Sequence, residues 1–446
     1  MAQKAKIQLS DHFDTRRLLR YTLPTIVMMI FTSIYSVVDG IFVSNFAGKL
    51  PFAAINLIYP PFMIIGAIGF MMGTGGSALV AKILGEGDHP RANRTFSLIT
   101  YTAIGVGVVV SAVALLLLRH LAVWLGAEGE ILDYCVRYGR IIIPALPAFI
   151  LQGMFQPFMV AAERPSLGLK VSLCAGCTNI VLDYVFIAIF GWGLEGAAIA
   201  TAISQLVAGG VPLIYFASRN SSLLHLGPTR WDGKALWQTC LNGSSEMATN
   251  ISASIVVILY NFQLLRYIGE DGVAAYGVIS YVLFIFIAIF LGYSTGSAPI
   301  VSYNHGAQRH DELHRVVRRS LRIIVLFSIG LTLLAEVLSS PLSHLFVGYD
   351  KELFSLTHRA LAIYSVSFLL AGINIYISSL FTALNNGIVS AVISFSRTLI
   401  FECGAVILIP MVFGIDGIWW AIVFAETAAL VMSGTFYLRH RKRYHY

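Results

Sequence analysis

The first half of the chain returns in the second half at an offset of about 221 residues. Residues 53–58 (AAINLI) return as 274–279 (AAYGVI), and 193–196 (GLEG) return as 414–417 (GIDG). Further identities keep the same offset: Thr74 with Thr295, Gly75 with Gly296, Val80 with Val301, and Gly85 with Gly306. All these segments lie in apolar sequence. A duplicated hydrophobic half is typical of secondary transporters built from two similar helix bundles, which hold the solute where the bundles meet.

The composition places the chain in a membrane. It has 446 residues, of which 57% are hydrophobic and only 12% are charged, whereas a soluble domain is about 25% charged. Long stretches such as 50–81 and 360–396 contain no charged residue, and roughly 20 apolar residues suffice to cross a bilayer as a helix. Residues 1–20 are polar and basic, so we expect no cleavable signal peptide there.

We predict an all-α integral membrane protein with twelve transmembrane helices in two pseudo-symmetric bundles of six. The expected spans are 22–46, 53–80, 97–118, 140–161, 167–190, 196–217, 238–265, 274–300, 322–340, 360–383, 389–412 and 418–438. Because each half has an even number of spans, both halves share one orientation and a pseudo-two-fold axis along the membrane normal. We expect Pro60-Pro61 to break the second helix.

The distribution of basic residues predicts the orientation. With the termini in the cytoplasm, all but eight of the 30 Lys and Arg residues fall on cytoplasmic ends and loops, as the positive-inside rule requires. The net charge of +7 therefore indicates lipid contact rather than nucleic acid. The expected domains are a cytoplasmic N-terminal segment (1–20), an N-terminal bundle (21–218), a cytoplasmic linker (219–236), a C-terminal bundle (237–438) and a basic cytoplasmic tail (439–446) that contacts anionic head groups.

Two aspartates inside the predicted spans are the strongest candidates for a functional site. Asp39 lies 19 residues after Arg20, and Asp183 lies 19 residues after Arg164. Since a helix rises about 1.5 Å per residue, both carboxylates lie roughly 28 Å from the cytoplasmic side. A charge at this depth is costly unless it has a partner, a proton or a function.

Each aspartate has a polar residue one helical turn earlier. Tyr35 precedes Asp39 and Asn179 precedes Asp183 by four residues, which places each pair on one helix face. Two carboxylates in a low-dielectric pocket disfavour double ionisation, so the pair predicts a site for a proton or a sodium ion. The alternative is that each aspartate is separately hydrogen-bonded and inert.

The second half lacks this acid pair. Alignment of the repeats puts Asn261 opposite Asp39 and Gly404 opposite Asp183. This asymmetry favours a coupling-ion site in the N-terminal bundle alone. The C-terminal bundle instead carries Arg397 together with three glutamates. We expect a neutralised network that fixes the helix register or contacts a cationic substrate. Its expected members besides Arg397 are Glu246, Glu402, Glu426, Asn261 and Asn374.

Other sequence features bear on a hinge, on metal or redox chemistry, and on catalysis. Pro24 lies in the helix that carries Asp39 and is a candidate hinge, either as a static bend or as a kink that straightens with protonation. The Cys174-x-x-Cys177 motif lies in an apolar helix and is typical of packing rather than of redox or zinc chemistry. No ATP-binding or hydrolase motif is present, so we expect no enzyme activity and no cofactor, and energy from an ion gradient.

These features together resemble the multidrug and toxic compound extrusion (MATE) family. The resemblance covers about residues 15–438 and depends on the 6+6 repeat, on Pro24 and on the residues around the two aspartates. The motifs are Val38-Asp39-Gly40, Asn179-Ile180-Val181-Leu182-Asp183 and Gly196-Ala197-Ala198-Ile199-Ala200-Thr201. Asn374 occupies the position where one branch of the family has an acid, which favours the prokaryotic DinF-like branch.

The resemblance implies a V-shaped pair of bundles and the export of amphipathic or cationic drugs in exchange for protons or sodium. It implies a cation site formed by Tyr35, Asp39, Tyr138, Asn179, Asp183 and Thr201, with no metal other than sodium. It places the protein in the bacterial inner membrane, and we expect a monomer. A flippase for lipid-linked oligosaccharides is the nearest alternative but would need a strongly basic cavity. An integral membrane transferase would need a catalytic cluster near one interface.

Overall fold

In the computed structural model every regular element among the described residues is helical. The structure describes residues 7–42 and 49–446, apart from the side chains of 36, 37, 39–42, 49 and 52. The first half consists of α1 (Thr15–Phe42), α2 (Lys49–Gly85), α3 (His89–Trp124), α4 (Gly129–Ile142), α5 (Leu146–Ala161), α6 (Pro165–Asp183) and α7 (Gly193–Ala217). The second half consists of α8 (Gly233–Tyr267), α9 (Glu270–Gly306), α10 (His310–Val347), α11 (Lys351–Ser365), α12 (Phe368–Ala383), α13 (Gly387–Phe395) and α14 (Cys403–Tyr444).

These helices account for the twelve predicted spans. Ten helical runs in the described residues are long and apolar enough to cross a membrane, and α11 with α12, bent by 45°, makes an eleventh. The last run covers Gly387–Tyr444, or 58 residues, which is about 87 Å of helix against a hydrocarbon core of about 30 Å. Gly414 divides it, because its φ of 62° and ψ of −140° are not helical. The predicted spans 389–412 and 418–438 lie on either side of this glycine.

Two prolines behave differently from the sequence-based expectation. α2 continues through Pro60 and Pro61 without interruption, so the predicted break of the second helix is wrong. Proline removes a backbone donor, but neighbouring helices and small local adjustments can satisfy the freed carbonyls within a membrane bundle. α1 likewise continues through Pro24.

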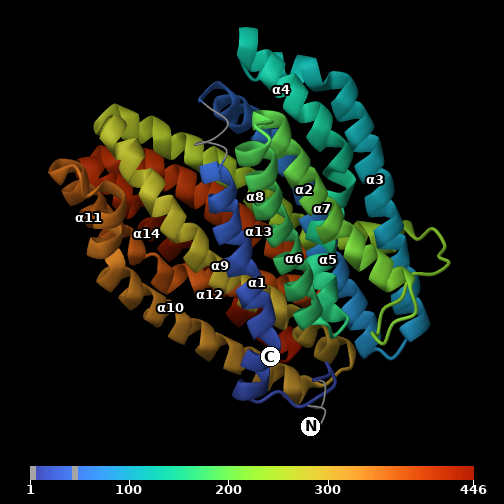
Figure 1. The fold of residues 1–446 in the computed structure, drawn as a ribbon. Helices are drawn as coiled ribbons and strands as arrows, with labels where there is room; N and C mark the ends of the chain where they lie inside the picture. Colours follow the sequence, from blue (N-terminus) through green and yellow to red (C-terminus); the bar gives the residue numbers. More distant parts are fainter. Residues whose placement is uncertain (1–6, 43–48) are drawn as a thin grey trace, which may run out of the picture.

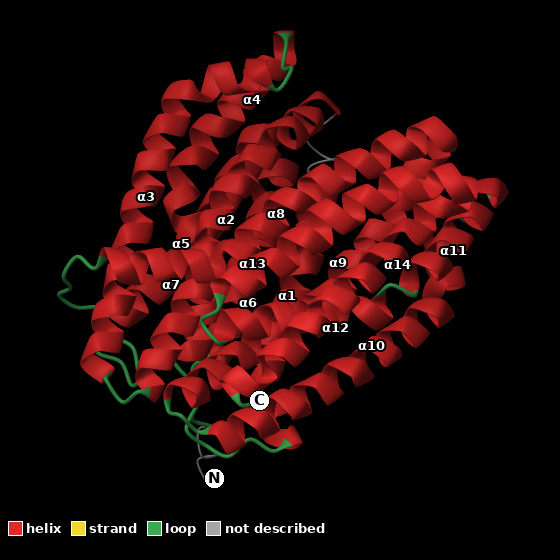
Figure 2. Ribbon diagram, turned by 180° about the vertical axis from the view of Figure 1, so that it is seen from behind, coloured by secondary structure: helices red, strands yellow, loops and turns green. Residues whose placement is uncertain are grey.

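The helices converge at one end of the molecule and spread apart toward the other. Both chain termini lie near the converging end (Figure 1), which we call the terminal end. Gly85 at the end of α2 lies against Tyr303 and Ala307, and the ring of Tyr444 near the C-terminus lies 5.6 Å from that of His305 at the end of α9. α3 and α4 lie on one side and α10 and α11 on the other in both views (Figure 2). At the centre α1 packs along α9, and α2 packs along both α8 and α9.

Repeat-related glycines bring the two halves into close contact. A Cβ atom on Gly85 would lie 2.1 Å from the carbonyl oxygen of Tyr303, and one on Gly306 would lie 2.0 Å from the carbonyl oxygen of Lys82. Tyr303 follows Lys82 by the same 221 residues that separate the two glycines. The crossing of α2 and α9 therefore repeats itself about the pseudo-two-fold axis, and only residues without a side chain fit there.

Substitution of these glycines tests the crossing. We expect Gly85→Ala and Gly306→Ala each to push α2 and α9 apart and to destabilise the protein by about 1–3 kcal/mol, because a methyl group would overlap backbone atoms. Distances between spin labels on α2 and α9 at the terminal end should increase, and the thermal unfolding temperature should fall. Gly277→Ala in α9 is the control, since no atom lies within 4 Å of its Cβ position. Unchanged distances in both variants would contradict the prediction.

The segment before α1 ties the two halves together at the terminal end. The backbone N–H of Leu9 donates to Glu163 Oε1 at 2.7 Å, and that of Phe13 donates to Glu312 Oε1 at 2.9 Å. Glu163 follows α5 in the first half, whereas Glu312 lies in the first turn of α10 in the second half. Leu9 and Phe13 are fully buried. We call residues 7–13 the N-terminal strap.

Candidate functional site

The candidate site of the first half is built on α1 and α6, which run parallel in contact. Contacts advance in the same direction along both helices, from Met28 near Gly168 to Phe31 near Gly176. A Cβ on Gly176 would lie 2.4 Å from the ring of Phe31, so glycine is what lets the two helices approach here.

This packing sets the level of the two aspartates along the helix axes. Asp39 lies eight residues beyond Phe31, and Asp183 lies seven residues beyond Gly176. At about 1.5 Å per residue these steps correspond to about 12 and 10 Å. Measured instead from the Met28–Gly168 contact, the steps are 11 and 15 residues, so the two backbones lie within about 6 Å of the same level. The side chain of Asp39 lies outside the described part of the structure, so the approach of the two carboxylates remains a prediction.

Asp183 belongs to a buried polar group inside the first half. Asp183 and Asn179 are both 0% exposed, although the surrounding sequence is apolar. The side-chain amide of Asn179 donates to Thr201 Oγ1 on α7 at 3.4 Å. Directly after Asp183 the backbone changes to a π-helical turn over Tyr184–Ile189. Such π turns occur mostly as single turns and frequently at functional sites.

The remaining residues predicted for this site come from α1 and α4. Tyr35 is partly buried on α1, and Tyr138 is 5% exposed on α4. Both take part in side-chain interactions. A sodium ion at this site would need oxygen ligands, which the carboxylate of Asp183 and the amide oxygen of Asn179 can supply.

Pro24 lies where α1 crosses α9. A Cβ on Gly292 of α9 would meet backbone atoms of Thr25 and Ile26, and one on Gly296 would meet Thr22. The proline is thus surrounded by close backbone contacts to the other half. Pro24 therefore remains a predicted hinge, placed at the crossing of α1 with α9.

The second half contains a buried ion pair between α14 and the π-helical turn Ser396–Glu402. The Arg397 guanidinium donates to Glu426 Oε1 through Nη2 at 2.6 Å and through Nε at 2.9 Å. Asn374 on α12 donates to Glu426 Oε2 at 2.7 Å, and the Ser433 hydroxyl donates to Asn374 Oδ1 at 2.7 Å. Glu426 is 2% exposed, so these partners rather than water offset the cost of burying its charge.

The other residues expected in this network are more distant. Glu402 lies close enough to Glu426 and Arg397 for electrostatic interaction, but makes no hydrogen bond with a described residue. Glu246 faces the same cavity as Arg397 and Asn374. Asn261 is partly buried on α8, about 22 Å along that helix from Glu246, and therefore does not join the network.

A small polar cavity lies between the two halves next to this network. It measures about 50 Å³, enough for one or two water molecules or a small ion. Thr74, Ser77 and Pro157 come from the first half, and the rest of the lining comes from the second. The second half contributes mainly hydroxyl, amide and ionisable side chains, among them Glu246, Thr249, Ser294, Thr295, Asn374, Ser378, Ser379, Thr382, Ser394 and Arg397.

Sequence reasoning missed the hydroxyl residues of this region. The Ser378 hydroxyl lies 3.1 Å from that of Ser390 and 2.8 Å from that of Ser394, and Thr382 lies 2.7 Å from Ser390. The four-residue spacing of Asn374, Ser378 and Thr382 places them on one face of α12. This periodic polar face in an otherwise apolar helix could have indicated the cavity from the sequence.

A twofold-repeated bundle of membrane-spanning helices, with polar groups buried within each half and a cavity between the halves, defines an integral membrane transporter. The MatE family model matches the chain in two segments, residues 24–185 and 247–404, one in each half. The chain belongs to the MATE family, whose members are transporters rather than enzymes. Its branch within the family remains a prediction.

Similar proteins agree with this family over nearly the whole chain. The multidrug export protein MepA of Staphylococcus haemolyticus (strain JCSC1435) is 26% identical over 436 residues, covering 96% of this chain and 94% of that protein. A crystal structure of a MATE protein in complex with MaL6 superimposes with a TM-score of 0.91 at 21% identity and covers 99% of both chains. The outward-facing conformation of a multidrug resistance MATE transporter also gives 0.91 at 21% identity, covering 100% of this chain and 99% of that one. These structures share the V-shaped fold.

Proposed function

We propose that this protein is a secondary active transporter that exports amphipathic or cationic drugs in exchange for protons or sodium by alternating access. The observation that carries this proposal is the fully buried Asp183 beside Asn179, and we expect Asp39 on the neighbouring helix to lie near its level. The naming of its relatives as multidrug export proteins supports the class of substrate. The positive-inside rule supports cytoplasmic termini, and we propose a monomer in the bacterial inner membrane.

In the proposed cycle, one cation is bound and released each time the carrier alternates between its outward-facing and inward-facing states. From outside, a proton or sodium ion reaches Asp39 and Asp183 and removes net charge from the membrane interior, which changes the packing of α1 against α6. Drug leaves outward, the carrier turns inward, and the cation is lost to the cytoplasm before drug binds again. One charge moving through 100 mV supplies about 2.3 kcal/mol, which concentrates a neutral solute roughly fifty-fold.

The contacts in the second half disfavour the flippase alternative. A carrier of lipid-linked sugars would offer deep, accessible cations to a pyrophosphate. Arg397, the deep cation predicted from the sequence, already donates to both carboxylate oxygens of Glu426. A pyrophosphate would therefore have to displace an ion pair that is almost fully buried.

Transport by the purified protein tests the proposal. In proteoliposomes we expect accumulation of an ethidium-like dye to be driven by an imposed proton gradient or an imposed sodium gradient. Collapse of that gradient with the matching ionophore should abolish the transport. Liposomes without protein and liposomes with equal ion concentrations on both sides are the controls. Dye accumulation at the same rate with and without either gradient would reject the exchange mechanism.

A further inference from the structure

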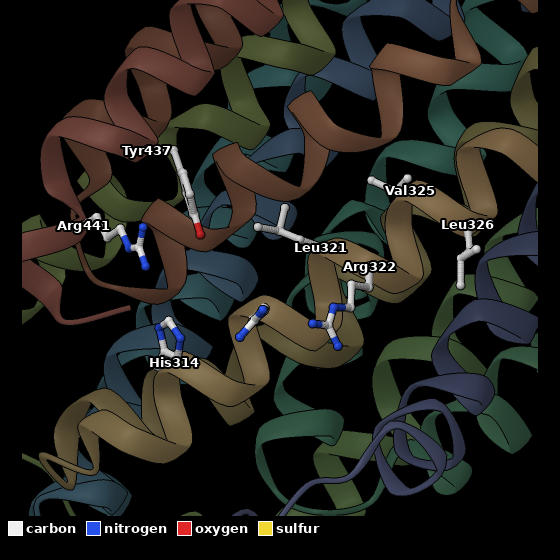
Figure 3. Close-up of a pocket in the computed structure, with 8 residues that line it drawn as sticks. His314, Leu321, Arg322, Val325, Leu326, Tyr437 and Arg441 are labelled. Carbon is white, nitrogen blue, oxygen red and sulfur yellow. The ribbon is translucent and has the colours of Figure 1, made fainter.

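A wide groove at the terminal end separates α10 from α14 and has no role in the proposed transport cycle. It measures about 740 Å³, within the range of ligand-binding pockets. Figure 3 shows Arg441 and Tyr437 of α14 on one side of it, and His314, Leu321 and Arg322 of α10 on the other. Arg318 of α10 completes its basic lining.

The basic residues of α10 divide into two sets with different surroundings. Arg315 donates to Glu312 Oε2 at 2.9 Å, and Arg319 donates to the carbonyl oxygen of Phe13. Arg318 and Arg322 are exposed, and neither forms an ion pair or a hydrogen bond with any described residue. The first set holds the N-terminal strap, whereas the second set offers its guanidinium groups to the groove.

The groove changes from charged to apolar along α10. His314, Arg318, Arg322 and Leu326 follow each other at four-residue spacing, so they form one ridge of the helix. Val325 and Leu326 are exposed to 39% and 67%, and the uncharged part of α10 begins directly after Arg322. Cations followed within one turn by exposed aliphatic side chains match the boundary between lipid head groups and acyl chains.

We propose that this groove binds an anionic phospholipid, with its phosphate between Arg318, Arg322 and Arg441 and an acyl chain along Val325 and Leu326. Guanidinium groups suit phosphate because their planar donors can form two parallel hydrogen bonds. The Tyr437 ring beside the groove supplies an amphipathic surface at the head-group level, as aromatic residues do at membrane interfaces. The apolar end of the groove, at Val325 and Leu326, favours a lipid over a soluble phosphate.

Native mass spectrometry of the full-length, delipidated protein in detergent tests this site. With palmitoyl-oleoyl phosphatidylglycerol as the probe, we expect adducts at concentrations at least tenfold lower than with the corresponding phosphatidylcholine. The variant Arg318→Gln/Arg322→Gln should weaken phosphatidylglycerol binding by roughly 10- to 30-fold, because each surface arginine contributes about fivefold or slightly less. Arg318→Lys/Arg322→Lys should retain the preference. Leu326→Glu should also weaken binding, since it places a carboxylate in the acyl path.

Matched controls separate this site from general charge effects. Arg219 and Arg230 in the linker are also exposed arginines, and Arg219→Gln/Arg230→Gln should bind phosphatidylglycerol as the unmodified protein does. The proposal is overturned if this control pair loses as much affinity as the groove pair, or if the groove pair loses none. It is also overturned if soluble glycerophosphoglycerol binds as tightly as the lipid, because the site would then recognise a free phosphate. Variants that do not elute as a single species are replaced by Arg318→Gln alone.

Discussion

Replacement of Asp183 by asparagine is expected to reduce gradient-driven export of an ethidium-like dye to the level of cells that lack the transporter. The substitution keeps the size of a fully buried side chain but removes the carboxylate that would take up a proton or a sodium ion. Asparagine does not titrate, so cation uptake and drug release would no longer be coupled. The same result is expected for Asp39→Asn, since both carboxylates belong to the proposed pair.

Dye efflux from energised cells, with the amount of protein in the membrane measured in parallel, checks this expectation. Asp133→Asn is a suitable control, because Asp133 lies exposed on α4 in the same half. This control should export at the normal rate. Normal export by Asp183→Asn at equal expression would reject the coupling site in the first half and leave the family assignment intact.

The second large effect is expected at the buried ion pair of the other half. Glu426→Gln or Arg397→Met should each destabilise the protein by about 3–5 kcal/mol, because each leaves a buried partner without compensation. The double variant Arg397→Met/Glu426→Met should recover most of that loss, since an apolar pair of similar volume no longer has a charge to bury.

Thermal unfolding in a single detergent measures the loss for the two single variants and the double variant. The exposed pair Arg137–Glu195, with a separation of 3.6 Å, provides the comparison, and Glu195→Gln should change stability by about 1 kcal/mol or less. Single variants as stable as the unmodified protein would show that the pair has no structural role. A double variant that is stable but does not export dye would indicate that the network also contacts substrate.

The large-scale organisation of this protein follows from local sequence patterns. The apolar runs predicted the spans because a helix is the structure that satisfies its own backbone in lipid. The repeat offset of 221 residues also predicted which glycines are equivalent, and the structure places Gly85 and Gly306 in reciprocal contacts. The residues at which the helices begin and end outside the membrane were harder to predict from the sequence. α10 begins at His310 rather than near 322, because a helix continues past the lipid boundary as far as its turns remain paired.

Side-chain partners were the hardest feature to predict. Arg397 and Glu426 are 29 residues apart, and the sequence indicated only that deep charges need compensation. The contribution of Ser433, which donates to Asn374, depends on how α12 and α14 face each other. The effect of Pro60 and Pro61 could not be predicted from the sequence, because a neighbouring helix can satisfy a carbonyl that the sequence alone leaves without a donor.

The N-terminal strap sets a limit on how far the molecule can open at its terminal end. Four residues separate the two anchored amides of Leu9 and Phe13, and a fully extended chain of that length spans about 14 Å. The strap can therefore hold both halves only while the distance between Glu163 and Glu312 stays within this length plus the two hydrogen bonds. A wider opening at the terminal end would break one of these two hydrogen bonds, and closing would form it again.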